Sequence, residues 1–184
     1  MIDLTFITGN QDKVDYLARH LGVPVKHLKV ELEELQSLDL RAIASHKARR
    51  AHEYLQSPVL VEDVALTFHA LGRLPGPFIK WFESELSYEK LCRLLDAYND
   101  RSATAACVFG YYDGTQLELF ESELHGSIAD HPRGNNGFSW DPIFIPDGYT
   151  ITRAEMGPED DEKTYIAIKP YAALRKFIEQ RHAL

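Results

Sequence analysis

Apolar residues occur along the chain in short runs and in helical stripes, which predict alternating strands and helices. Residues 2–8 are β-prone and end at a Gly-Asn turn, after which apolar residues recur at helical spacing, at Val14, Leu17, Ala18 and Leu21. Residues 25–30 are a further possible strand. The apolar run Val59-Leu60-Val61 predicts a buried strand that stops at two carboxylates, Glu62 and Asp63.

A long helix is predicted to start after Asp39 and to end near Leu55. Asp39 is a good N-cap, and the apolar stripe that follows it consists of Leu40, Ile43, Ala44, Ala48, Ala51 and Leu55. Ser87 is expected to cap another helix, and Pro170 fits the first turn of the last one.

A hairpin is predicted in the second half of the chain. Residues 103–112 and 116–124 are β-prone and flank Asp113-Gly114-Thr115, and Asp-Gly between such runs is a strong hairpin signal. Residues 125–136 are expected to form a loop. Because the two strands of the hairpin are antiparallel, we expect the sheet that they extend to be mixed and not purely parallel.

The length, composition and charge of the chain limit which kinds of protein it can be. The 184 residues suit one domain spanning residues 1–184. Twenty basic and 28 acidic side chains give a net charge of −8, which argues against a broad nucleic-acid surface. No apolar run approaches the roughly 20 residues needed to span a bilayer, and the first residues lack the basic start of a signal peptide. We therefore expect a cytoplasmic protein that binds neither nucleic acid nor membrane.

Three positions carry candidate chemistry without reference to any family. Glu62 and Asp63 follow a predicted core strand, where α/β proteins place functional groups, although an acidic turn would explain Glu62 equally well. The turn from Thr8 to Lys13 joins a glycine to a helix start, which suits anion binding or simply a capping turn. Lys47 lies on the core-facing side of its helix, so its ammonium is expected either to snorkel to water or to enter an anionic site.

Several strings together resemble the inosine triphosphate pyrophosphatase family, whose members hydrolyse non-canonical purine nucleoside triphosphates. They are Thr8-Gly9-Asn10-Gln11-Asp12-Lys13, then Val61-Glu62-Asp63 with the unusual run Leu74-Pro75-Gly76-Pro77-Phe78-Ile79-Lys80-Trp81-Phe82, and Phe138-Ser139-Trp140-Asp141-Pro142. The resemblance extends from about Thr8 to Ala173. It implies an α/β fold with a long mixed sheet flanked by helices, two lobes with a central nucleotide cleft, and a homodimer.

The resemblance also implies roles for individual residues. The bond cleaved would be the one between the α and β phosphates, giving a monophosphate and pyrophosphate. Glu34, in Glu34-Leu35-Gln36, and Asp63 would hold Mg²⁺, and Asp63 would orient or deprotonate the attacking water. The phosphates would contact Thr8, Asn10, Lys13, Lys47 and Lys80. The base and sugar end would consist of exposed aromatic side chains and polar groups: Phe138, Trp140, Asp141, Lys163 and Lys169.

Two departures leave the substrate open. Ser139 stands where the family has glycine, and Ala167-Ile168-Lys169 stands where the family has Ser-His-Arg, which reads the keto edge of the purine. The expected substrates are ITP, dITP and XTP. The alternatives are the same chemistry on another modified or pyrimidine nucleotide, or a catalytically weak nucleotide-binding sensor.

Overall fold

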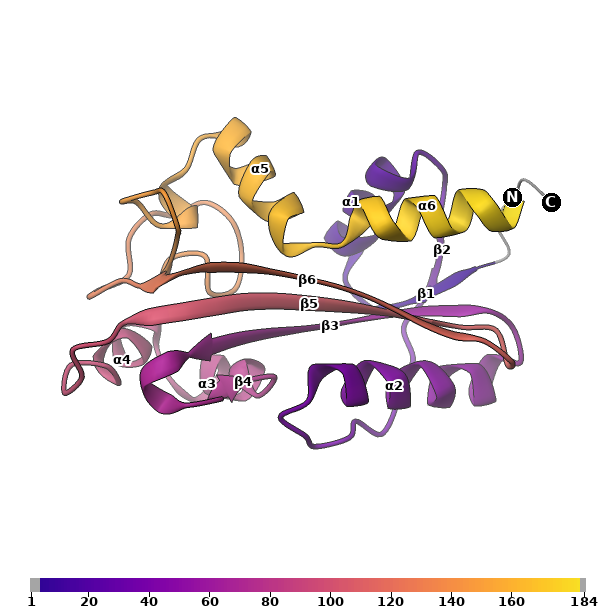
Figure 1. Cartoon of the computed structure of the whole chain (residues 1–184), viewed down its shortest axis with the longest axis horizontal. Helices are drawn as coiled ribbons and strands as arrows, with labels where there is room; N and C mark the ends of the chain where they lie inside the picture. The colour runs from indigo at the N-terminus through magenta and orange to yellow at the C-terminus, as the bar shows by residue number, and fades with distance from the viewer. Residues whose placement is uncertain (1–3, 183–184) are drawn as a thin grey trace. The chain divides into compact units, whose positions relative to one another are not determined.

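The computed structural model describes residues 4–182 (Figure 1). In chain order its elements are β1 (Thr5–Ile7), α1 (Gln11–Leu21), β2 (Lys26–Leu28), α2 (Leu40–Leu55), β3 (Val59–Phe68), η1 (His69–Leu71), β4 (Pro75–Gly76), α3 (Ile79–Glu85), α4 (Tyr88–Arg93), β5 (Ser102–Tyr112), β6 (Leu117–Ile128), β7 (Phe144–Pro146), η2 (Arg153–Glu155), α5 (Pro158–Ile168) and α6 (Tyr171–His182). Within these residues, no helix is both long enough and apolar enough to cross a membrane.

The described strands form one seven-stranded sheet. Its order is β2-β1-β3-β5-β6-β7, and β4 pairs with β3 beside this path. β1 runs parallel to β2 and to β3, whereas β4 is antiparallel to β3 and β7 is antiparallel to β6. The predicted α/β fold with a mixed sheet and flanking helices is therefore confirmed.

The chain divides into two compact units. Unit 1 comprises the residues up to Asp63, Cys107–Glu121 and the residues from Pro170 onward, whereas unit 2 comprises Val64–Ala106 and Ser122–Lys169. The strands β3, β5 and β6 contribute residues to both units.

Packing in unit 1 follows the two-residue period of its strands. Val59 and Val61 of β3 and Val108 of β5 lie in one cluster with the small residues of α2, Ala44, Ala48 and Ala51. The alternate residues of β5 face α6 instead, where Phe109 packs against Tyr171 and Tyr111 against Phe177. Figure 1 accordingly shows α2 on one side of these strands and α1 and α6 on the other.

The helix starts predicted at Asp39 and Ser87 are confirmed, since both capping side chains are in place, and α6 begins at Tyr171, directly after Pro170. The Asp39 carboxylate accepts the backbone N–H groups of Arg41 at 2.9 Å and Ala42 at 3.2 Å. Asn10 caps α1 and Ser87 caps α4 in the same way, and α2 ends at Leu55 as expected.

Two predicted strand boundaries are wrong. β3 does not stop at Glu62 and Asp63 but continues to Phe68, so both carboxylates lie inside a ten-residue strand. The residues after Asp63 are themselves β-prone and apolar, and β4 pairs with them at Leu66 and Thr67. β6 likewise continues to Ile128, where it pairs with Phe144 of β7, so residues 125–128 are strand instead of loop.

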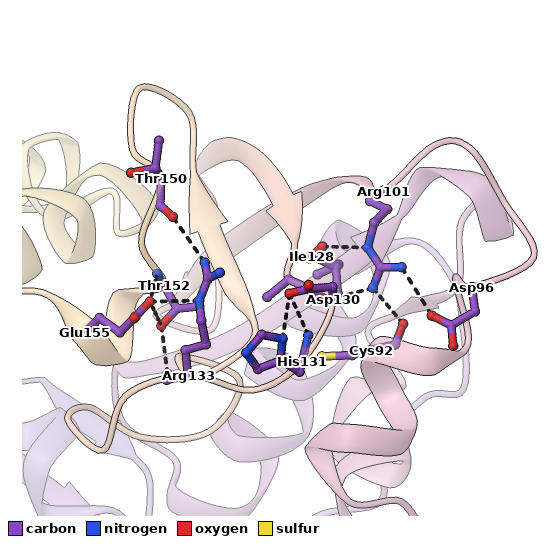
Figure 2. Close-up of polar contacts among 11 residues, drawn as sticks. Cys92, Asp96, Arg101, Ile128, Asp130, His131, Arg133, Thr150, Thr152 and Glu155 are labelled. Carbon is purple, nitrogen blue, oxygen red and sulfur yellow. Dashed lines mark hydrogen bonds and ion pairs between the residues drawn. The ribbon is translucent and has the colours of Figure 1, made fainter.

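Two partly buried arginines tie together irregular segments of unit 2 (Figure 2). The Arg101 guanidinium donates to the backbone oxygens of Ile128, Cys92 and Ala129 at 2.9, 2.8 and 2.6 Å. It thereby links the end of β6 to α4 through backbone carbonyl groups. The Arg133 guanidinium donates in a similar way to Glu155 and to the backbone oxygen of Thr150.

Candidate functional site

Each of the two carboxylates of β3 forms an ion pair with a lysine of unit 1. Neighbouring residues of a strand point to opposite faces, so Glu62 faces α1 and Asp63 faces α2. Lys13 Nζ on α1 lies 3.0 Å from Glu62 Oε1, and Lys47 Nζ on α2 lies 2.9 Å from Asp63 Oδ1. The strand thus presents one lysine–carboxylate pair on each of its faces.

The Lys47 side chain is mostly enclosed by the protein. Its side chain is only 16% exposed, and besides Asp63 its ammonium contacts the backbone oxygen of Glu62 at 3.3 Å and Glu34 Oε1 at 3.6 Å. Of the two fates expected for this lysine, the structure therefore shows the one in an acidic site. Glu34 itself is nearly half exposed, at 48% of its side chain.

Within the part of the chain that the structure describes, Asp63 uses only one of its two carboxylate oxygens for hydrogen bonding. Oδ1 accepts the hydrogen bond from Lys47, whereas Oδ2 is buried and has no hydrogen-bond partner among the described residues. Burial raises the pKa of Asp63, and the charge and hydrogen bond of Lys47 offset only part of that rise. A buried acceptor without a partner is costly, so Oδ2 is a position that a cation or a proton donor would satisfy.

The turn before α1 is closed by its own side chains, which cap the start of the helix. Asn10 Oδ1 accepts the N–H of Lys13 at 3.2 Å, and Thr8 Oγ1 accepts the N–H of Asn10 at 3.1 Å. A side chain at Gly9 would crowd the aliphatic part of Lys29, with a Cβ 2.9 Å from Lys29 Cδ. The free amides of a helix start and the Lys13 ammonium both favour negative ligands.

The predicted residues of the base end lie in unit 2, on the loop of residues 137–141 and on α5. Asp141 is buried and uses both oxygens inside the protein, because Oδ1 accepts Arg153 Nη1 at 2.6 Å and Oδ2 accepts the N–H of Phe138 at 2.9 Å. Gly137 has a φ of +75°, and a Cβ there would overlap Asp141 Oδ2. Asp141 therefore organises this loop from within.

One aromatic expectation is correct and the other is wrong. Phe138 is 45% exposed and makes an edge contact with Tyr165 of α5, with ring centroids 6.3 Å apart. Trp140, expected to be exposed, is only 8% exposed. It lies beside the buried Asp141, and Ile143 just after it is fully buried, so this segment of the chain runs through the core.

The lysines of unit 2 differ in exposure. Lys80 on α3 is exposed, with Nζ 5.5 Å from the Trp81 ring centroid, and Lys163 on α5 is exposed as well. Lys169 is buried at the end of α5, with Nζ 5.6 Å from the Tyr165 ring centroid. Ile168, in the position of the family's histidine, is buried and apolar.

Sequence reasoning missed Arg153, which lies beside Asp141 in the predicted base end of unit 2. The Arg153 side chain is 4% exposed; Nη1 binds Asp141, and Nη2 lies 2.7 Å from Asp161 Oδ1. Its Nε donates to Thr164 Oγ1 at 3.1 Å. Burial raises the pKa of Asp141, and the Arg153 guanidinium offsets part of the rise. A single arginine between Thr152 and Ala154 follows no period, so no pattern could have indicated it.

The fold and site define an α/β protein whose mixed sheet carries carboxylates bound to lysines. The chain belongs to the Ham1 family, since the model of that family matches residues 4–180. It is 42% identical to "Inosine triphosphate pyrophosphatase 2" of Trypanosoma cruzi over 89% of this chain and 85% of the relative. It is 38% identical to "Inosine triphosphate pyrophosphatase" of Batrachochytrium dendrobatidis over 100% of this chain and 98% of the relative.

A solved structure of a similar protein has the same fold. A HAM1 protein from Coxiella burnetii superposes with a TM-score of 0.85 at 27% identity, covering 98% of this chain and 100% of that one. The expected family resemblance is confirmed.

Proposed function

We propose that this chain hydrolyses non-canonical purine nucleoside triphosphates, namely ITP, dITP and XTP, to the monophosphate and pyrophosphate. The relatives named above support the activity. The observation that carries the proposal is the pair of lysine–carboxylate contacts on β3, with one Asp63 oxygen unsatisfied. Lysines can bind the phosphates of a triphosphate, and carboxylates can bind a metal ion and orient a water molecule. The two pairs therefore supply both kinds of group that the reaction requires.

The phosphate-binding role falls to the lysines and the start of α1. Lys13 and Lys47 would exchange part of their contact with Glu62 and Asp63 for phosphate oxygens, to which charged donors bind strongly. Thr8 and Asn10 would contribute polar contacts beside the free amides of α1. Lys80 of unit 2 is the third proposed phosphate lysine.

The residues of unit 1 fit a magnesium ion. Within residues 4–182 no three His, Cys, Asp or Glu side chains gather closely enough to hold a metal by themselves. Mg²⁺ does not need three, because it keeps several waters and binds one or two carboxylates together with substrate phosphates. Asp63, through its unsatisfied Oδ2, and Glu34 would hold it. When bound, the ion would act as a Lewis acid on the phosphates.

Asp63 would also position the attacking water. A nearby cation lowers the pKa of a carboxyl group, which would keep Asp63 ionised. An ionised carboxylate with a low pKa is a weak base but a good hydrogen-bond acceptor, so its contribution would be mainly orientation of the water.

At the base end, Phe138 offers an exposed ring for stacking on a nucleobase. Lys163 and Lys169 are proposed to donate to the base or sugar, whereas buried Trp140 and Asp141 would act by shaping the loop.

A second candidate is the same hydrolysis on another modified base or on a pyrimidine nucleotide. Buried Ile168 favours it, because an apolar side chain cannot donate to a keto oxygen. A nucleotide-binding sensor without turnover is the third candidate.

Pyrophosphate release with Mg²⁺ from ITP, dITP, XTP, dUTP and the four canonical triphosphates tests these candidates. We expect ITP and XTP to exceed ATP and GTP in kcat/KM by about 10²-fold, since one well-placed polar contact discriminates to about that degree. Turnover only of a nucleotide with a different base would change the proposed substrate but leave the proposed reaction unchanged. Tight nucleotide binding without any pyrophosphate release would instead support the nucleotide-binding sensor.

Glu34→Gln is expected to raise the Mg²⁺ concentration for half-maximal activity by about tenfold or more, because it removes one negative ligand. Glu33→Gln is the matched control, since Glu33 is an exposed carboxylate one residue away on the same segment. A magnesium titration of pyrophosphate release distinguishes the two. Equal magnesium requirements in both variants would remove Glu34 from the metal site.

We further infer that residues 1–184 act as one cytoplasmic domain in a homodimer. Sedimentation of the purified protein tests the dimer.

A further inference from the structure

The loop of residues 137–141 contains a strained backbone position. Ser139 has a φ of +57°, in the left-handed region, and among residues 4–182 only Gln56 is another non-glycine with positive φ. Side chains other than glycine disfavour this region. The resemblance places glycine at this position, so the serine requires a compensating contact.

That contact is a carboxylate on α3. Ser139 Oγ donates to Glu83, at 2.8 Å from Oε1 and 2.9 Å from Oε2. The Tyr88 hydroxyl of α4 donates to the same Oε1 at 3.3 Å. Burial raises the pKa of Glu83, and the hydrogen bonds from Ser139 and Tyr88 oppose the rise. A hydrogen bond to an ionised acceptor is stronger than a neutral one, so this contact can hold a strained residue.

The contact lies between side chains already assigned to the base end. Ser139 separates exposed Phe138 from buried Trp140, and the N–H of Phe138 is fixed by Asp141. Holding Ser139 therefore fixes the backbone from which the Phe138 ring projects. Glu83 also lies three residues after Lys80, which places the two as neighbours on α3.

We propose that Glu83 and Ser139 are positioning residues for the nucleobase, which hold Phe138 in place by their hydrogen bond. This inference rests on the proposed function, because it assigns the 137–141 loop to the base. The base is remote from the bond that is cleaved, so loss of the contact weakens substrate binding and leaves the chemical step unchanged. The effect accordingly falls on KM and not on kcat.

The sizes of the rise in KM caused by two substitutions at position 139 test the proposal. Ser139→Ala keeps the unfavourable φ and loses the donor, so KM for ITP is expected to rise about tenfold, the size of one charge-assisted hydrogen bond. Ser139→Gly loses the donor but relieves the strain, so the rise is expected to be smaller, about threefold. An unchanged or lower KM in Ser139→Gly would overturn the proposal.

A double-mutant cycle tests the pair. Glu83→Ala is expected to raise KM about tenfold, and the double variant with Ser139→Ala also about tenfold rather than a hundredfold, because both changes remove one interaction. Glu85→Ala, an exposed carboxylate on the same helix, is the control with unchanged KM. Independent, multiplying effects or a fall in kcat at constant KM would contradict the pair's role.

A readout without substrate separates this proposal from the function on which it depends. Hydrogen exchange of the Phe138 amide in nucleotide-free protein is expected to accelerate about tenfold in Ser139→Ala and in Glu83→Ala, since local opening sets its rate. Unchanged exchange would overturn the positioning role. Failure of the proposed function would instead be seen as absence of pyrophosphate release from the unaltered protein with every nucleotide.

Discussion

Replacing Asp63 by asparagine is expected to lower kcat for pyrophosphate release by about 10²- to 10⁴-fold, the range that a positioned acid or base contributes. The substitution keeps the shape of the side chain and an oxygen that can accept the hydrogen bond from Lys47, now at 2.9 Å. It removes the charge that would hold the metal and orient the water. We therefore expect folded protein that still binds ITP, as measured by calorimetry.

The control for this experiment is Asp130→Asn. Asp130 is a largely exposed carboxylate beside His131 in unit 2 (Figure 2), and its removal is expected to change kcat by less than about twofold. Turnover of Asp63→Asn at a near-normal rate would exclude Asp63 from the mechanism. Loss of both turnover and ITP binding would instead assign Asp63 to substrate binding.

Arg153→Met is expected to cost about 3–5 kcal/mol of folding free energy, because it leaves the Asp141 carboxylate buried without its cation. That is a large part of the stability of a typical domain, about 5–15 kcal/mol. Urea unfolding measures the loss as a lower midpoint at constant slope. Adding Asp141→Asn to Arg153→Met should recover part of the loss, since it removes the unpaired charge.

The loss should also depend on pH. A carboxyl group whose pKa is raised by folding stabilises the protein most below its unfolded pKa of about 3.9, and its contribution falls as pH rises through the folded pKa. Burial already raises the pKa of Asp141, and removing Arg153 raises it further. Arg153→Met should therefore lose more stability at about pH 7 than at about pH 5.

Arg133→Met is the matched control for Arg153. Arg133 contacts Glu155 and the Thr150 backbone oxygen near the surface (Figure 2), so its removal should cost about 1 kcal/mol. A cost for Arg153→Met within about 1 kcal/mol of this control would show that the buried pair contributes little net stability.

Local patterns predicted the helix starts and the hairpin because their interactions span only a few residues. Asn10 and Asp39 cap helices within three positions. Asp113 holds its own turn by accepting the N–H groups of Thr115 at 2.9 Å and Gln116 at 2.7 Å. Strand ends were less predictable, since β3 and β6 are extended by pairing with β4 and β7.

The motifs predicted which residues to examine, and the amino-acid sequence by itself determined the acidic and basic groups on β3, α1 and α2. Only the tertiary structure decided that Lys13 and Lys47 bind opposite faces of one strand, that Trp140 is buried, and that Arg153 and Glu83 contact the 137–141 loop. The physical reason is that an ion pair or hydrogen bond between distant segments imposes no period on the chain. Its partners become recognisable only when folding brings their side chains together and removes them from water.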